Sequence, residues 1–118
     1  MKHERKGFRR LLSALSNSRD GFVAAWRSEE AVRLELVLAL FVVVAIALVP
    51  AARVEKILLW LATFFVLFAE VVNTAIEYAV DRMGTGWHAL SKTAKDLGSL
   101  LVLISLANFV LVWIWVLA

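Results

Sequence analysis

The chain has 118 residues, of which 62% are hydrophobic and none is cysteine. Soluble domains are about half apolar, so this composition indicates a membrane protein, and the lack of cysteine excludes a disulfide framework or a thiolate metal site. The net charge is +3, and eight of the thirteen Lys and Arg residues lie in the first 33 positions. A basic start beside apolar spans favours membrane lipids as partners and argues against nucleic acid.

Residues 7–30 are polar overall but carry a periodic apolar pattern. Phe8, Leu11, Leu12 and Leu15 have the spacing i, i+3, i+4 and i+7, which is typical of one helix face. We expect an amphipathic helix that lies on the membrane surface and is broken or bent near residues 17–21. The segment lacks the single apolar core and small-residue cleavage site of a signal peptide.

Three apolar segments follow. Residues 31–49 carry charges only at Arg33 and Glu35, and as a helix they span about 28 Å, roughly one bilayer core. The link that begins at Pro50 is short, so the second span, at about 54–81, returns antiparallel. A polar, glycine-bearing loop at 82–95 precedes the last span, 96–118. The expected fold is an all-α membrane protein of one domain, with three transmembrane helices and an N-terminal amphipathic surface helix.

The distribution of basic residues predicts the orientation in the membrane. With three spans, the N-terminus and the second loop share one side, which also carries Arg82, Lys92 and Lys95. The opposite side carries only Arg53 and Lys56. The positive-inside bias therefore places the N-terminus and the second loop in the cytoplasm.

Polar side chains interrupt the apolar second span. Glu70, Asn73, Glu77 and Asp81 fall on one stripe of that helix, in the half nearer the cytoplasm. Ionisable groups at this depth are rare and usually functional. Two structural alternatives are that the glutamates hold helices together or pair with Arg33 and Lys95.

The opposite half of the membrane region is nearly free of polar side chains. A transporter or channel needs polar groups there too, and a non-catalytic scaffold needs fewer carboxylates than this chain has. A one-sided polar site indicates chemistry between a cytosolic reagent and a molecule that lies in the membrane.

Carboxylates at this spacing suit Mg²⁺, which takes one or two carboxylates together with phosphate oxygens, and a nearby lysine can hold a phosphate. The chain has no G-x-x-x-x-G-K-[ST] loop and no protein-kinase motif, so phosphoryl transfer needs a site built differently. Three helices are too few to enclose both a nucleotide and a lipid. We expect the site to lie between subunits of a symmetric oligomer.

Three segments carry a family resemblance: AAWRSEEAVRLE (24–35), AEVVNTAIEYAVDR (69–82) and KDLGS (95–99). With them the chain resembles the small prokaryotic diacylglycerol kinases over nearly its whole length. The resemblance implies a homotrimer of three-span subunits in the prokaryotic plasma (inner) membrane. It implies Mg²⁺-dependent transfer of the γ-phosphate of ATP to diacylglycerol, giving phosphatidic acid. An undecaprenol kinase, which the same family contains, is the alternative.

The resemblance also implies roles by position. Glu70 matches the catalytic base, and Glu29 and Glu77 match the metal ligands beside the nucleotide. Nucleotide contacts are matched by Arg10, Asn17, Glu29, Glu77, Gly86, Trp87, His88, Lys95 and Asp96. Contacts with the lipid substrate are matched by Arg10, Ala31, Val32, Arg33, Leu34, Glu35, Lys56, Glu70, Ser99 and Trp113. Asn73 and Asp81 match polar positions that support the site. Residues 16–19 and the last five residues match the family least well.

Overall fold

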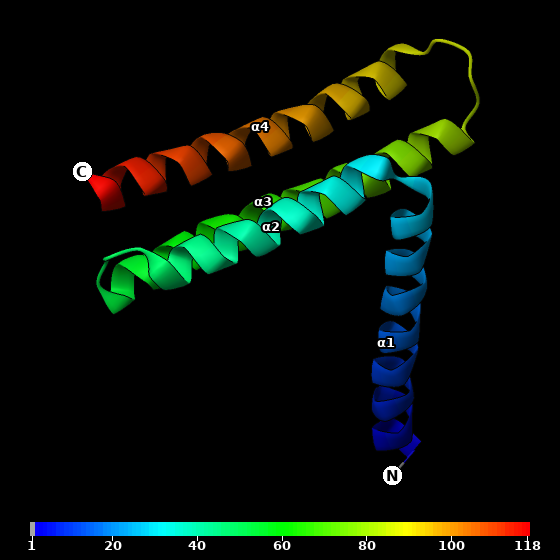
Figure 1. The fold of residues 1–118 in the computed structure, drawn as a ribbon. Coiled ribbons are helices and arrows are strands. Elements are labelled where there is room, and N and C mark those ends of the chain that lie inside the picture. The colour runs from blue at the N-terminus through cyan, green and yellow to red at the C-terminus, as the bar shows by residue number, and fades with distance from the viewer. Residues whose placement is uncertain (1) are drawn as a thin grey trace. The chain divides into compact units, whose positions relative to one another are not determined.

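The computed structural model describes residues 2–118. Within this range the chain forms four α-helices and no strand: α1 (Lys2–Ser28), α2 (Glu30–Leu48), α3 (Arg53–Arg82) and α4 (Ala89–Leu117) (Figure 1). Among these described helices, α2, α3 and α4 are long and apolar enough to cross a membrane. The predicted all-helical fold with three membrane-spanning segments is therefore confirmed at this level. The chain divides into two compact units, residues 1–38 and 39–118.

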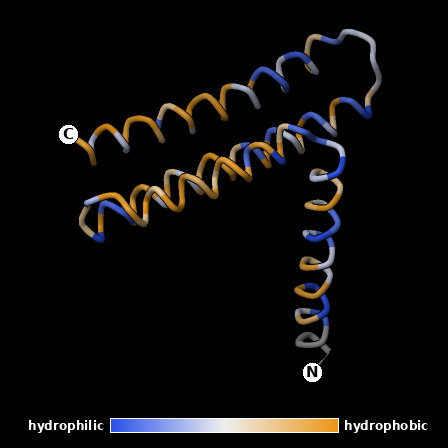
Figure 2. The backbone as a smooth tube through the Cα atoms, in the orientation of Figure 1, coloured by the Kyte–Doolittle hydropathy of each residue, from blue (hydrophilic) through white to orange (hydrophobic). Residues whose placement is uncertain are grey.

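The first unit contains α1 and the start of α2. The predicted break in α1 is wrong, because the helix continues without interruption through residues 17–21. Ser18 Oγ donates to the Ala14 carbonyl at 2.7 Å, which satisfies the hydroxyl within the helix, and an isolated glycine such as Gly21 costs a helix only about 1 kcal/mol. Apolar and polar residues alternate along α1 (Figure 2), and the side chains of Phe8 and Leu15 are exposed. The membrane-surface position of α1 stays a prediction.

Glu29 is the single non-helical residue between α1 and α2. Arg33, in the first turn of α2, donates from Nη1 to the carbonyl of Trp26 at 2.6 Å and to that of Arg27 at 3.4 Å. These carbonyls belong to the last turn of α1, where intrahelical partners are lacking, and a cation is favourable at that end of a helix. Arg33 therefore caps α1.

In the second unit, α3 and α4 run antiparallel and pack side by side (Figure 1). Apart from the fully buried Leu59, the residues buried on these two helices are small: Ala62, Thr63, Ala69, Gly98 and Ser105. Small side chains let two backbones approach closely, which is how helices associate in lipid, where burial of apolar surface gives little driving force. The α3–α4 contact is therefore built mainly from small residues.

The two buried hydroxyls of this contact are satisfied within their own helices. Thr63 Oγ1 donates to the Leu59 carbonyl at 2.8 Å, and Ser105 Oγ donates to the Val102 carbonyl at 2.7 Å. Such bonds let a hydroxyl enter an apolar region without a partner on another helix. Among the described residues, these two buried hydroxyls are therefore satisfied without a polar bond between α3 and α4.

The loop between α3 and α4 is shorter than predicted. It covers residues 83–88, because α4 begins at Ala89, seven residues before the expected start of the last span. Residues 89–95 are polar but include the strong helix formers Ala, Leu and Lys. At about 43 Å, α4 is longer than a bilayer core of about 30 Å, so its polar start can lie outside the hydrocarbon. Gly84 supplies the left-handed backbone, with φ of 120°, that turns the chain after α3.

Side-chain hydrogen bonds also order the connection between α2 and α3. Lys56 Nζ donates to the Ala47 carbonyl at 2.9 Å, and Glu55 Oε1 accepts the N–H of Ala52 at 3.0 Å. Lys56 thus satisfies a carbonyl in the last turn of α2, and Glu55 satisfies a backbone donor at the start of α3. The short link is fixed at both of its ends.

The first prediction tests the α3–α4 contact. Ala62 is only 3% exposed, so Ala62→Val adds methyl groups where two backbones are close and should destabilise the protein by about 1–3 kcal/mol. Ala107, on α4, is exposed, and Ala107→Val is the matched control with little expected effect. Unfolding in detergent, followed by circular dichroism, checks both variants. Equal stability of the two variants would contradict the contact.

Candidate functional site

Polar residues of α3 and α4 gather at one end of the helix pair. Along both helices, hydrophilic residues concentrate next to the 83–88 loop, whereas the middle of each helix is hydrophobic (Figure 2). Because the helices are antiparallel and joined by that loop, the last turns of α3 lie beside the first turns of α4. The candidate site is built on these turns.

Glu70 is the polar site residue of α3 that lies farthest from the loop. It is half-buried and follows Ala69, which is fully buried. It lies about 25 Å along the helix from Arg53, which places it within a bilayer core of about 30 Å when α3 spans the membrane. No described residue forms a hydrogen bond or ion pair with its carboxylate. Within the described chain, the Glu70 carboxylate therefore keeps its acceptor positions unused.

Glu77 lies two turns farther along the same helix and is held by Asn73. Asn73 Nδ2 donates to Glu77 Oε1 at 3.2 Å, and both side chains are half-buried. An ionised carboxylate offers about four acceptor positions, so this bond orients Glu77 and leaves acceptors for a cation. The structural alternative in which Glu77 forms an ion pair with Lys95 is not seen in the described chain, where the hydrogen-bond partner of Glu77 is the Asn73 amide.

Lys95 instead joins α4 to the last turn of α3. Its Nζ lies 2.7 Å from Asp81 Oδ1, and the two side chains are 45% and 65% exposed. An ion pair this exposed contributes about 0–1 kcal/mol. Lys95 can therefore exchange Asp81 for another anion at small cost.

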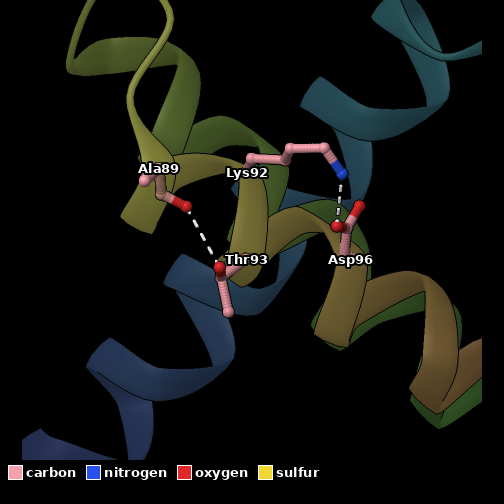
Figure 3. A network of polar contacts seen from close by, with 4 residues as sticks. All are labelled: Ala89, Lys92, Thr93 and Asp96. Carbon is pink, nitrogen blue, oxygen red and sulfur yellow. Dashed lines mark hydrogen bonds and ion pairs between the residues drawn. The ribbon is translucent and has the colours of Figure 1, made fainter.

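Asp96 has a partner that the sequence reasoning missed. Lys92 Nζ lies 2.7 Å from Asp96 Oδ2, one turn away on α4, and beside this pair Thr93 Oγ1 donates to the Ala89 carbonyl at 3.0 Å (Figure 3). The i, i+4 spacing of Lys92 and Asp96 is the signal that could have found the pair. The start of α4 thus presents two lysines and one aspartate to solvent.

His88, predicted to contact the nucleotide, has a structural bond of its own. It is the N-cap residue of α4, and its Nδ1 accepts the N–H of Leu90 at 3.1 Å. This bond satisfies one of the first N–H groups of the helix, which have no intrahelical acceptor. The neighbouring Trp87 is 79% exposed, and Gly86 is exposed in the same loop. Nucleotide contacts by these three residues stay predictions.

The remaining predicted residues occupy both units. In the first, Arg10 and Asn17 line a shallow basic hollow on α1 together with Lys6, Arg9, Ser13 and Ala14. Glu29 and the segment from Ala31 to Glu35 lie at the junction of α1 and α2. In the second unit, Ser99 is exposed on α4, and the ring of Trp113 near the end of α4 lies at 60° to the ring of Phe109. The indole N–H of Trp113 is buried and has no hydrogen-bond partner among the described residues.

The two predicted metal ligands belong to different units, Glu29 to the first and Glu77 to the second. Within residues 2–118, no group of three or more His, Asp or Glu side chains is arranged to hold a metal ion. Mg²⁺ does not require such a cage, because it commonly binds one or two carboxylates and completes its coordination with phosphate and water. The pairing of Glu29 with Glu77 at a metal stays a prediction.

The fold and the polar end of the α3–α4 pair define an all-helical membrane protein with carboxylates and lysines at one end of its spans. Residues 16–117 match the family model for prokaryotic diacylglycerol kinase. A protein named diacylglycerol kinase from Helicobacter pylori is 43% identical over 108 residues, covering 92% of this chain and 84% of the relative. The protein of that name from Escherichia coli K12 is 38% identical over 113 residues, covering 96% and 93%. The one from Pseudomonas aeruginosa is 39% identical over 108 residues, covering 91% and 87%.

The chain belongs to the prokaryotic diacylglycerol kinase family. This assignment confirms the predicted family and the prediction that the chain is an enzyme. It also shows that the family could be found from the three segments that carry the resemblance.

The second prediction concerns the His88 cap. Replacing a good N-cap residue by alanine costs about 1 kcal/mol, so His88→Ala should lower the free energy of unfolding by about that amount. His88→Asn keeps an acceptor for the Leu90 N–H and should retain the stability. Chemical unfolding in detergent separates the two variants. If His88→Asn is destabilised as much as His88→Ala, the capping role is contradicted.

Proposed function

We propose that the chain transfers the γ-phosphate of ATP to the hydroxyl of diacylglycerol, giving phosphatidic acid and ADP. The observation that carries the proposal is Glu70, a half-buried carboxylate without a partner in the described chain, on an otherwise apolar stretch of α3. An alcohol is a poor nucleophile, and a carboxylate within hydrogen-bond reach can take its proton as it attacks. The hydroxyl oxygen then forms a bond to the γ-phosphorus, and the bond to the bridging oxygen of ADP breaks.

The nucleotide would lie at the loop end of the same helix pair. Lys95 is exposed and forms an exposed ion pair with Asp81, so a phosphate can take the place of that aspartate. Lys92 lies one turn before Asp96 on the same helix and adds positive charge there. Phosphoryl transfer depends mainly on alignment and on neutralising charge, and two lysines at the start of α4 supply the second requirement.

The donor set fits Mg²⁺. Glu77 presents hard carboxylate oxygens. It accepts one hydrogen bond from Asn73, and an ionised carboxylate has about four acceptor positions, so it retains positions for a cation. Glu77 would hold the metal, with Glu29 as the second ligand. When bound, Mg²⁺ neutralises phosphate charge and aligns the γ-phosphate for transfer.

Undecaprenol is the alternative acceptor. The same carboxylates would serve a longer prenol, so the difference lies in the surface that binds the lipid chain. The names of the relatives favour diacylglycerol. A transporter is disfavoured because the distant half of the described α3–α4 contact carries few polar side chains, and the hydroxyls of Thr63 and Ser105 bond within their own helices.

We propose further that the enzyme is a homotrimer in the prokaryotic plasma (inner) membrane, with the N-terminus and the 83–88 loop in the cytoplasm. The basic residues on α1 and at the start of α4 support this orientation. In the described part of α2, only Ile46 is buried, so most of that helix is free to contact lipid or another subunit. Glu29 and Glu77 belong to different units of the chain. A site shared between subunits of the trimer would let these two carboxylates bind one metal ion.

The third prediction tests Glu70 as the general base. Glu70→Gln keeps the size of the side chain and should lower kcat on a short-chain diacylglycerol by about 10²–10⁴-fold, the range for a positioned acid or base. Glu55→Gln is the matched control, because Glu55 lies at the opposite end of α3 and glutamine keeps the oxygen that accepts the Ala52 N–H. The control should retain the wild-type kcat.

Mg²⁺-ATP affinity and oligomer size should be nearly unchanged in Glu70→Gln. If the variant keeps more than about a tenth of the wild-type kcat, its loss of activity is far smaller than expected for a missing base. That result would remove Glu70 from the role of base.

The fourth prediction tests Glu77 as a metal ligand. Glu77→Gln keeps an oxygen that can accept from Asn73 but removes the negative charge, so the Mg²⁺-dependent affinity for ATP should fall by about tenfold or more, which is at least about 1.4 kcal/mol. Calorimetric titration with ATP is run with Mg²⁺ and again with excess chelator. Binding without metal should be the same in both proteins. Equal Mg²⁺-ATP affinities would assign Glu77 a purely structural role.

A further inference from the structure

Gly98 on α4 lies directly against the side chain of Asn73 on α3. Gly98 is buried, and a Cβ atom at this position would overlap Asn73 Oδ1 and lie 3.3 Å from Asn73 Cγ and 3.5 Å from Ile76 Cδ1. The other four glycines have nothing within 4 Å of the same position. Gly98 is therefore the one glycine whose missing side chain makes room for another residue.

The amide of Asn73 is fixed by what lies on its two sides. Nδ2 donates to Glu77 Oε1, whereas Oδ1 is buried and has no conventional hydrogen-bond partner among the described residues. A Cβ atom at position 98 would overlap this oxygen, so the oxygen occupies the space that the glycine leaves open. Turning the amide over would put its oxygen against the Glu77 carboxylate, where two acceptors repel. The observed orientation is the one that gives Glu77 a donor.

Gly98 also sets the register between the two helices. Lys95 and Asp96 precede it by three and two residues, and Lys95 reaches Asp81 on α3 at 2.7 Å. A larger residue at position 98 would push α4 away from α3 or turn the Asn73 amide. Either movement changes the position of Glu77 relative to Lys95.

We propose that Gly98 is a positioning residue for the kinase site: it admits the Asn73 amide between α3 and α4, and through Asn73 it orients Glu77 opposite the start of α4. The inference rests on the proposed function, because it assigns Glu77 to the metal and Lys95 to phosphate. Gly98 itself touches neither ATP nor the lipid, and it acts by leaving space for the Asn73 amide.

A double-mutant cycle tests the proposal with Gly98→Ala, Asn73→Ala and the double variant. Loss of a residue that orients a metal ligand typically lowers metal affinity about 10–100-fold, so each single variant should weaken Mg²⁺-dependent ATP binding by that factor in calorimetry. The double variant should bind no more weakly than Asn73→Ala alone, because Gly98 acts through Asn73. Affinity losses that multiply in the double variant would overturn the proposal.

Thermal unfolding of the same variants gives a readout that does not depend on activity. Gly98→Ala should lower the unfolding temperature, and adding Asn73→Ala should restore it to the level of Asn73→Ala alone, because the overlapping amide is gone. Ala62→Val, in the same helix contact but remote from the site, should lower the unfolding temperature without changing Mg²⁺ affinity. A Gly98→Ala variant that behaves like Ala62→Val in both measurements would make Gly98 a packing residue only.

The two readouts also separate this inference from the proposed function. If the wild-type protein bound no Mg²⁺-ATP and transferred no phosphate, the proposed function would fail, and thermal unfolding would still decide whether Gly98 acts through Asn73. Additive losses of stability in the double variant would overturn the contact itself.

Discussion

The close approach of α3 and α4 is the constraint on which the candidate site depends. In lipid, two helices gain little from burying apolar surface against each other, so they associate through close packing and polar contacts. Here the packing comes from Ala62, Ala69, Gly98 and Ser105, which are all nearly or fully buried. Because these residues are small, the polar groups carried on the two helices come within hydrogen-bond distance. The pair of Lys95 and Asp81 across the helices is the result.

The cost of placing carboxylates in an apolar helix explains how they are distributed. Glu77 receives a hydrogen bond from Asn73, and Asp81 lies in the exposed last turn of α3 opposite a lysine. Glu70 has neither a hydrogen-bond donor nor a cationic partner within the described chain. An ionisable group that lacks both at membrane depth is a functional candidate, and a substrate hydroxyl is the partner that the family assignment suggests for it.

Local patterns in the sequence predicted the elements, and errors arose where local signals were misleading. The three spans follow from uninterrupted apolar runs, and the stripe from Glu70 to Asp81 follows from the helical period. Polar residues near Asn17 suggest a break, although a helix accommodates them on an exposed face. The polar start of α4 suggests a loop for the same reason. The contacts of Gly98 with Asn73 and of Lys95 with Asp81 were not predictable, because they depend on the register of two helices, which packing determines.

Phosphate transfer to lipid by the purified protein tests the central claim most directly. The protein in lipid bilayers is supplied with Mg²⁺ and ATP labelled in the γ-phosphate, together with either diacylglycerol or undecaprenol, and the lipid fraction is counted. The account predicts label in phosphatidic acid with diacylglycerol, little label with undecaprenol, and none when Mg²⁺ is chelated. Label that appears only with undecaprenol would contradict the substrate, and an unlabelled lipid fraction with both lipids would contradict the kinase function itself.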